Sequence, residues 1–337
     1  MFKTIESKLA TLRLGVSEVH ENSERLDALQ INQGILLAAL NQAKHSSNLK
    51  DYEFKVFSQW GEDGILQRLT SAIEIPEKTF IEFGVEDFFE SNCRFLMMKD
   101  NWRGFVMDGS AANIGRLQRA YFYWKYELTA VEAFITRENI NELLAKSGFG
   151  PDLGILSVDI DGNDYYVWEA TEEFRPSLVM IEFNPTMSNS ILFVQKKDPG
   201  VKHGSSAASI VELAGRKGYE LVAATEANLL FVKREFYAAF DIADNSLPLI
   251  RDDSGVPQLF IGFDGHVFLS QANAPAAVPM PWHGIEIRET DVQVLPRRLQ
   301  KFPGDYTRAE RFLFRLRFGF KRPRRFLRRL LRRGDRQ

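Results

Sequence analysis

Short β-rich runs that alternate with helical stretches are the feature that most constrains the fold of this chain. Five such runs, apolar on both faces, occupy residues 78–85, 103–110, 125–134, 153–162 and 176–185. A strand that is apolar on both faces must be buried on both, so the alternation predicts a mostly parallel sheet covered by helices on each side. Residues 205–236 add a helix and two closely spaced runs, which should pair as an antiparallel hairpin. The predicted fold class is therefore α/β.

The rest of the chain divides into segments around this sheet domain. We expect an N-terminal helix in residues 1–50, the sheet domain in 51–240, a small β-containing appendage in 241–305 and a basic amphipathic tail in 306–337. Within the appendage, residues 257–269 predict one hairpin around Asp264 and Gly265. A hydrophobic content of 45% is enough for a packed core and excludes a disordered or collagen-like chain.

Features that the sequence lacks indicate where the protein works. A single cysteine, Cys93, excludes an intrachain disulfide, and no cluster of cysteine and histidine suggests structural zinc. The first residues contain no apolar run typical of a secretory signal, and nowhere do about 18 apolar residues follow one another. We therefore expect a cytoplasmic protein that is soluble or peripheral on the inner face of the plasma membrane.

The N-terminal helix carries a heptad-like seam. Apolar residues recur at spacings of 4, 3, 4 and 3 at Ile5, Leu9, Leu12, Val16 and Val19. Two interpretations stay open. The helix forms a short coiled coil that joins copies of the chain into a homo-oligomer, or it packs as an amphipathic helix on its own domain.

Charge is distributed very unevenly along the chain. Residues 311–337 contain 12 Lys/Arg and one acid, Asp335, whereas residues 1–310 hold 31 basic and 44 acidic residues. The tail interleaves these arginines with Phe and Leu, and Pro323 should divide its helix into two pieces. This composition is typical of a helix that lies in an anionic membrane surface. Nucleic acid is the rival partner, and the large apolar residues favour the membrane.

Acidic residues end nearly every predicted strand. Because ligands of an open parallel sheet gather at the carboxyl ends of its strands, this edge is the predicted site. The first turn has one glycine, Gly84, and lacks the three-glycine pattern that cradles a pyrophosphate. Its acids, Glu86 and Asp87, would repel phosphates. A ligand with a cationic centre and a ribose fits this edge better than a dinucleotide or a nucleoside triphosphate.

The order of these features resembles the class I S-adenosylmethionine-dependent methyltransferases. Residues 57–66, FSQWGEDGIL, resemble the Ser-Gln-x-Gly-Glu-Asp motif of the FkbM-type members. Residues 159–164, DIDGND, resemble their Asp-x-Glu-Gly-x-Glu motif, with Asp at both Glu positions. The resemblance covers about residues 52–236. It implies a Rossmann-like sheet with one antiparallel strand, S-adenosylmethionine as cofactor, and O-methylation of a sugar or a cell-surface glycan precursor. The basic tail adds the expectation that this methylation takes place at the cytoplasmic membrane face.

The resemblance also implies roles for individual residues. Glu82 and Gly84 would shape the cofactor pocket, Asp108 would accept the ribose hydroxyls, and Glu132 or its neighbours Ala133 and Phe134 would border the adenine. Four residues of the motif before the first strand would cap the same pocket: Ser58, Gln59, Glu62 and Asp63. Asp159 and Asp161 would lie beside the transferred methyl group. Glu86 replaces the usual second glycine of the first turn.

A sugar hydroxyl is a poor nucleophile, so a base or a metal must relieve it of its proton. His203, in the loop after the fifth strand, is the histidine best placed to act as a base beside Asp159 and Asp161. Hard oxygen ligands for Mg²⁺ would come from Asp159, Glu182 and Asn184. The simpler interpretation is that Asp161 and Asp164 cap the following helix.

Two further functions compete with methyl transfer. The chain could be a non-catalytic Rossmann-like scaffold of a membrane-associated assembly, which would bind no S-adenosylmethionine. A nicotinamide-dependent sugar oxidoreductase is weakened by the missing three-glycine pattern.

Overall fold

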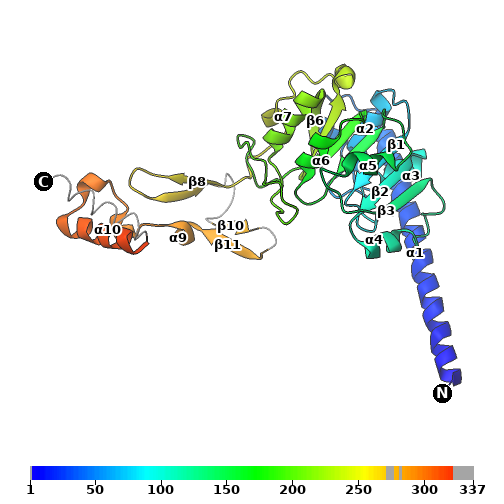
Figure 1. Cartoon of the computed structure of the whole chain (residues 1–337), viewed down its shortest axis with the longest axis horizontal. Helices are drawn as coiled ribbons and strands as arrows, with labels where there is room; N and C mark the ends of the chain where they lie inside the picture. Colours follow the sequence, from blue (N-terminus) through cyan, green and yellow to red (C-terminus); the bar gives the residue numbers. More distant parts are fainter. Residues whose placement is uncertain (1, 271–276, 281–282, 322–337) are drawn as a thin grey trace. The chain divides into compact units, whose positions relative to one another are not determined.

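The computed structural model describes residues 2–270, 277–280 and 283–321, in two compact units, residues 1–253 and 254–337 (Figure 1). The first unit holds the predicted sheet. Pro323 and the break that it predicts in the tail lie outside the described residues.

A seven-stranded sheet is the framework of the first unit. Its strands are β1 (Thr79–Phe83), β2 (Arg103–Asp108), β3 (Leu128–Glu132), β4 (Ile155–Val158), β5 (Leu178–Glu182), β6 (Tyr219–Ala224) and β7 (Asn228–Lys233), in the order β3-β2-β1-β4-β5-β7-β6. Strands β1 to β5 pair in parallel, and β7 is antiparallel to both β5 and β6. The predicted fold class, a mostly parallel Rossmann-like sheet with one antiparallel strand, is therefore confirmed.

Helices cover both faces of this sheet. One face carries α2 (Glu62–Ala72), α3 (Arg94–Asp100), α4 (Ala111–Leu117) and η2 (Arg234–Phe240); the other carries α5 (Ile140–Ala145), α6 (Asp164–Ala170), α7 (Ala207–Lys217) and α8 (Leu247–Ile250). Alternate residues of each strand point to opposite faces, so Phe80 packs in the first core and Ile81 in the second. This double burial explains why the central strands are apolar on both sides.

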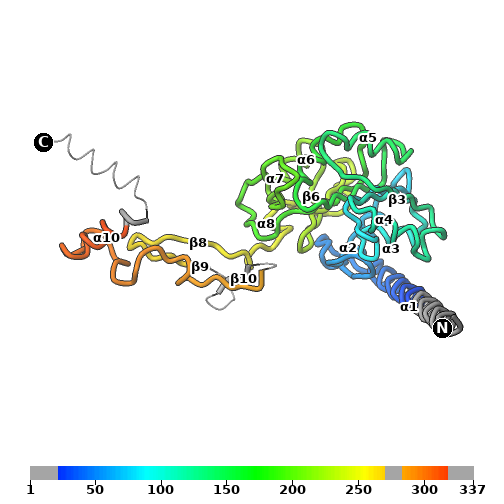
Figure 2. Tube along the Cα trace, turned by 60° about the horizontal axis from the view of Figure 1, so that its bottom comes forward, coloured from blue at the N-terminus to red at the C-terminus, as the bar shows by residue number. Residues whose placement is uncertain are grey.

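Helix α1 (Phe2–Gln42) is attached to the sheet unit beside α2 and α3 (Figure 2), and η1 (Leu49–Tyr52) follows it. Asp27 is buried and forms an ion pair with Arg94, and it accepts a hydrogen bond of 2.6 Å from the Tyr121 hydroxyl. The Arg94 guanidinium lies between two rings, 4.0 Å from the centroid of Phe57 and 4.2 Å from that of Phe122. A buried cation is tolerated only where such partners surround it, so this cluster fixes α1 to the domain.

The packed part of α1 supports one of the two interpretations of the helix. Ala38 joins a core with Phe54 and Phe95, and a Cβ on Gly34 would lie 2.5 Å from the side chain of Val56. Four leucines of α1 are exposed on the same stretch: Leu26, Leu29, Leu36 and Leu40. The C-terminal half of α1 therefore packs on its own domain, and a coiled coil between copies stays a prediction.

The second unit is built from short elements. They are β8 (Gln258–Ile261), β9 (Val267–Ser270), β10 (Ala277–Met280), β11 (Ile285–Arg288), α9 (Glu289–Val292), η3 (Arg297–Leu299), η4 (Pro303–Asp305) and α10 (Arg308–Lys321). Strands β8 and β9 form the predicted hairpin, which turns at Gly265 with a φ of +79°. Leu247 of α8 packs in the core of the sheet unit, so that unit continues to Asp253 and the appendage begins later than residue 241.

The buried Asp27–Arg94 pair gives a prediction for stability. Replacing Asp27 by Asn leaves Arg94 without a counter-charge, which should lower the free energy of unfolding by about 3 kcal/mol. Glu24→Gln is the matched control, because Glu24 forms an exposed ion pair with Lys125 and its loss should cost less than about 1 kcal/mol. Urea unfolding measures both variants, and equal losses would contradict the role given to Asp27.

Candidate functional site

The strand order reverses between β1 and β4, and this position brings the first turn against the end of β4. Gly84 follows β1 with a φ of +66°, and a Cβ there would lie 1.8 Å from the backbone oxygen of Asp159. Only glycine fits this close crossing, and it leaves the backbone of Gly84 exposed at the edge. The predicted Gly84 and Asp159 are therefore direct neighbours.

Glu82 holds the loop that follows Gly84. Its buried carboxylate accepts hydrogen bonds from the Ser91 hydroxyl (2.7 Å) and from the backbone N–H groups of Asn92 (2.8 Å) and Cys93 (3.3 Å). Burial raises the pKa of Glu82 to about 7, against the opposing effect of these bonds. Glu82 thus shapes the edge by fixing backbone, because its oxygens are committed to residues 91–93.

Asp108 ends β2 next to this loop. One of its oxygens accepts the Glu86 N–H at 3.0 Å, and the other accepts the Ser110 N–H at 2.7 Å and the Asn113 amide at 3.2 Å. The Asp108 side chain is buried at the edge, and it joins the Glu86 turn to the start of α4. Glu86 has a φ of +48°, a strained conformation at the position where the methyltransferase pattern has glycine.

The end of β3 lies beside Asp108. Glu132 is in register with Asp108 and is exposed, while the N–H of Ala133 donates to the Asp108 carbonyl at 3.0 Å. Phe134 is 65% exposed, and its ring lies 3.7 Å from where a Cβ of Gly109 would be. The structure thus places an uncovered aromatic ring next to the Asp108 turn, where the adenine was predicted.

The motif before β1 folds around its own acids. Asp63 accepts hydrogen bonds of 2.7–2.8 Å from the backbone N–H groups of residues 56, 57 and 58 and from the Ser58 hydroxyl. Glu62 accepts from Thr225 (2.6 Å) and Asn228 (2.9 Å) of the β6–β7 hairpin. Ser58, Glu62 and Asp63 are buried, whereas Gln59 is exposed. Three of the four predicted capping residues therefore bind protein groups, and Gln59 is the one whose side chain reaches the surface.

This motif nevertheless belongs to the same edge. The carbonyl of Phe57 accepts the N–H of Ser91 at 3.1 Å, which ties it to the loop held by Glu82. Burial raises the pKa of Asp63 to about 6, and its hydrogen bonds oppose the rise.

Three carboxylates gather where β4 and β5 end. One oxygen each of Asp159, Asp161 and Glu182 lies within 4.8 Å of the other two. Burial raises the pKa of Glu182 to about 10, and the nearby charges of Asp159 and Asp164 add to this rise. Burial also raises the pKa of Asp159, which shares a hydrogen bond with Glu182. Burial and the neighbouring carboxylates thus raise the pKa of both members of this Asp159–Glu182 pair.

Asp161 and Asp164 divide the roles expected of the strand-four motif. Asp164 is buried, and its two oxygens accept the N–H groups of Ile160 and Gly162, each at 2.8 Å. Asp161 is exposed, has a φ of +57° and pairs with Lys202 at 3.0 Å. Asp164 is the first residue of α6 and therefore stabilises the turn before this helix, whose cap position, Asn163, forms no side-chain cap hydrogen bond. The interpretation that Asp161 and Asp164 cap the helix is wrong, and Asp161 lies exposed at the surface of the site.

His203 and Asn184 lie together beside this cluster. The Asn184 amide donates to the His203 carbonyl at 2.6 Å, and its oxygen accepts from Thr186. The side chain of His203 is exposed. Since its oxygen is occupied, Asn184 fits the predicted metal set less well than Asp161 does.

Gln195 is the residue of this edge that the sequence analysis missed. It is fully buried and accepts the N–H groups of His203 and Gly204 at 2.9 Å each, while its own amide donates to the Val201 carbonyl. A Cβ on Gly162 would lie 3.0 Å from this side chain, so the loop is pressed onto the strand-four turn. A single glutamine in a polar loop carries no sequence signal for this role.

No family model and no curated protein matches the chain. Among solved structures, the N-terminal domain of EvdMO1 with SAH bound is 10% identical, with a TM-score of 0.32 over 46% of this chain and 73% of that one. A structure described as a caffeoyl-CoA O-methyltransferase from Staphylococcus aureus is 13% identical, with a TM-score of 0.33 over 60% of this chain and 99% of that one. The assignment of the fold rests on the strand order and pairings above.

The buried Glu82 and Asp63 predict how stability changes with pH. Their folded-state pKa values of about 7 and about 6 lie above the unfolded values, so the folded protein binds these protons more tightly. Their stabilisation is complete below the unfolded pKa values and is lost as the pH rises through about 6 to 7. We expect a higher Tm at about pH 5 than at about pH 8.

Calorimetry at several pH values measures this dependence. Glu82→Gln, which removes one of the titrating groups, should flatten the profile. A Tm that falls steadily from about pH 8 to about pH 5 would contradict the assignment.

Proposed function

We propose that this protein is an S-adenosylmethionine-dependent O-methyltransferase of the FkbM type. The observation that carries the proposal is the meeting of Gly84, Asp108 and the Asp159 cluster at the point where the strand order reverses. An open parallel sheet binds its ligand at this place. The two motifs in residues 57–63 and 159–164 support the finer assignment.

The residues of the edge fit the cofactor by charge and by hydrogen-bonding type. Asp108 offers carboxylate oxygens to ribose hydroxyls, and the exposed backbone of Gly84 admits close approach. Phe134 offers a ring face for the adenine. The acids of this edge favour a positively charged sulfonium over a phosphate. When bound, S-adenosylmethionine supplies a methyl group that is already activated for transfer.

The chain's own residues must then position a hydroxyl and take its proton. The backbone of Asp159 lies against the first turn, and its carboxylate, which is hydrogen-bonded to Glu182, is our first candidate to accept that proton. His203 is the second candidate base. Two exposed aromatic residues, Trp60 (44%) and Phe89 (47%), stand on the loops of this edge and support an acceptor with an apolar ring face, such as a sugar or a glycan precursor.

Mg²⁺ would be held by Asp159, Asp161 and Glu182, the hard oxygen ligands that the cluster offers. It would assist deprotonation of the hydroxyl. Turnover after rigorous chelation distinguishes deprotonation by the carboxylates alone from deprotonation assisted by Mg²⁺. Retained turnover would support the carboxylates alone. Turnover that is lost on chelation and restored by added Mg²⁺ would support the metal.

Binding of S-adenosylhomocysteine to the full-length protein tests the proposal. We expect micromolar binding by calorimetry and none of NAD. Asp108→Ala should weaken the binding of S-adenosylhomocysteine at least about tenfold, because the ribose loses its carboxylate partner. Asp152→Ala is the control, since Asp152 forms an exposed ion pair with Lys233 before β4. A folded protein that binds no S-adenosylhomocysteine would overturn the proposal and support the scaffold.

We also propose that the protein acts at the cytoplasmic face of a membrane, bound through α10. No helix in the described part of the chain is long and apolar enough to cross a bilayer. One face of α10 packs inward: Phe314 contacts the ring of Tyr306 at 5.8 Å, and Glu310 accepts from Lys301 and Thr307. Another face exposes Phe312 (64%), Leu313 (39%) and Leu316 (44%) among exposed arginines. An apolar strip flanked by cations suits an interface of anionic lipids.

Vesicle sedimentation tests this second proposal. Replacing both Phe312 and Leu316 by Glu in the full chain should abolish binding to vesicles that contain phosphatidylserine, because the apolar anchor is lost. Leu259→Glu is the matched control, since Leu259 of β8 is equally exposed (52%) but lies outside α10. Undiminished binding by the double variant, or a preference for single-stranded RNA over these vesicles, would contradict a membrane anchor.

A further inference from the structure

Helix α1 carries an exposed row of leucines along the part that packs on its own domain. Their exposed fractions are 61–66%, and they are Leu26, Leu29, Leu36 and Leu40. The last three each follow a buried residue of the packed face, Asp27, Gly34 or Ala38, by two positions. Two positions turn an α-helix by about 200°, so these leucines lie almost opposite the packed face.

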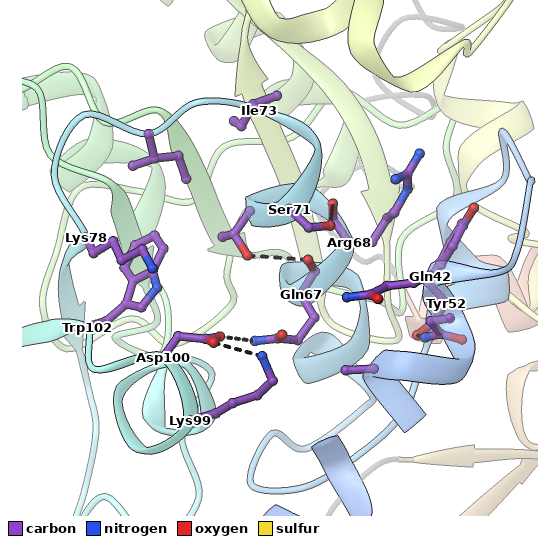
Figure 3. A pocket seen from close by; sticks show the side chains of 14 residues that line it. Gln42, Tyr52, Gln67, Arg68, Ser71, Ile73, Lys78, Lys99, Asp100 and Trp102 are labelled. Carbon is purple, nitrogen blue, oxygen red and sulfur yellow. Dashed lines mark hydrogen bonds and ion pairs between the residues drawn. The ribbon is translucent and has the colours of Figure 1, made fainter. Parts of the chain in front are cut away.

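The packed face continues to the end of the helix. The Asn41 amide donates to the Tyr52 carbonyl at 2.7 Å, next to a cavity of about 520 Å³ whose wall includes Ala38, Asn41 and Gln42. Figure 3 shows Gln42 and Tyr52 at this cavity together with Arg68 of α2. The domain therefore occupies one side of α1 up to residue 42 and leaves the leucine row uncovered.

The spacing of the row is that of a coiled-coil seam. With the exposed Gln33 it forms a leucine stripe at positions 26, 29, 33, 36 and 40, separated by 3, 4, 3 and 4 residues. A period of 3.5 residues keeps a narrow strip in contact with one neighbouring helix. A helix that packs on a broad surface buries a wider face. The stripe therefore fits a second helix that runs alongside α1.

The leucine stripe continues the apolar seam of residues 5–19. Helix α1 is unbroken over Phe2–Gln42, and Ser23 lies four residues after the last position of that seam and three before Leu26. The combined seam has eleven positions, nine of them aliphatic, with alternating spacings of 4 and 3 except for a spacing of 3 on either side of Leu26. Such an irregularity overwinds a coiled coil only locally. The seam spans about five heptads, or about 50 Å of helix, more than the three or four that indicate a coiled coil.

The chemistry around the stripe favours a protein helix as its partner. No charged residue occurs between Asp27 and Lys44. The exposed neighbours of the stripe are small or neutral: Ala28, Asn32, Ala39 and Ala43. A helix that lies in a membrane surface surrounds its apolar face with cations, which this stretch lacks. A second copy of the same neutral stripe brings no like charges together and buries no charge.

We propose that α1 pairs along this seam with α1 of a second copy of the chain, as a two-stranded coiled coil. The same surface is used by both copies, as in a symmetric dimer. Pairing uses the face opposite to the one packed on the domain, so both interpretations of the helix hold in one molecule. Gln33 places a polar residue in the apolar seam, which fixes the register of a coiled coil at some cost in stability. This interface does not depend on the function proposed for the carboxyl edge.

Sedimentation equilibrium of the full-length protein at micromolar concentrations tests this pairing, and we expect a dimer. Replacing both Leu29 and Leu36 by Glu should raise the dissociation constant of the dimer by at least about a hundredfold, because the new charges would be buried in the seam without partners. Both leucines are exposed in the single chain, so the double variant should stay folded. A cooperative urea transition checks this.

Leu249→Glu is the matched control, because Leu249 is 68% exposed on α8 and lies outside the seam. This variant should dimerise like the unchanged protein. A full-length protein that is monomeric would overturn the proposal. A dimer that the double variant retains, or that Leu249→Glu also loses, would overturn it as well, because association would then use another surface or exposed apolar area in general.

Discussion

Buried carboxylates that accept backbone N–H groups hold together the edge on which the proposed chemistry depends. Glu82 fixes the loop after β1, Asp108 fixes the Glu86 turn, Asp63 folds the segment before α2, and Asp164 closes the turn after β4. Each carboxylate gives up hydration to make these bonds, and desolvation opposes its charge. Irregular loops at the end of a sheet have backbone donors with no strand to pair with, and these acids satisfy them.

The alternation of apolar runs and helices was enough to predict the sheet, because the pattern of apolar residues in each strand and helix reflects which of its faces are buried. Val106 and Phe105 are neighbours on β2 and face opposite cores. Both are apolar because both faces of the strand are buried. The sequence also placed the acids correctly at the carboxyl edge. It did not show which acids bind backbone groups and which face solvent. Glu62 and Asp161 are both acidic residues at the predicted site, yet Glu62 is buried against the β6–β7 hairpin and Asp161 is exposed. That difference depends on contacts across more than 160 positions of sequence separation for Glu62, which no local pattern contains.

The attachment of α1 to the sheet unit also could not be predicted from the sequence. A heptad-like spacing predicts an apolar face but not what covers it. Asp27 lies beyond that spacing and looks like a surface residue in the sequence, yet it is the counter-ion of Arg94, which is held between two rings. Arg94 also donates to the carbonyl of Phe89 at 3.1 Å, in the loop that Glu82 holds. Arg94 therefore bonds both to the anchor of α1 and to the loop that borders the candidate site.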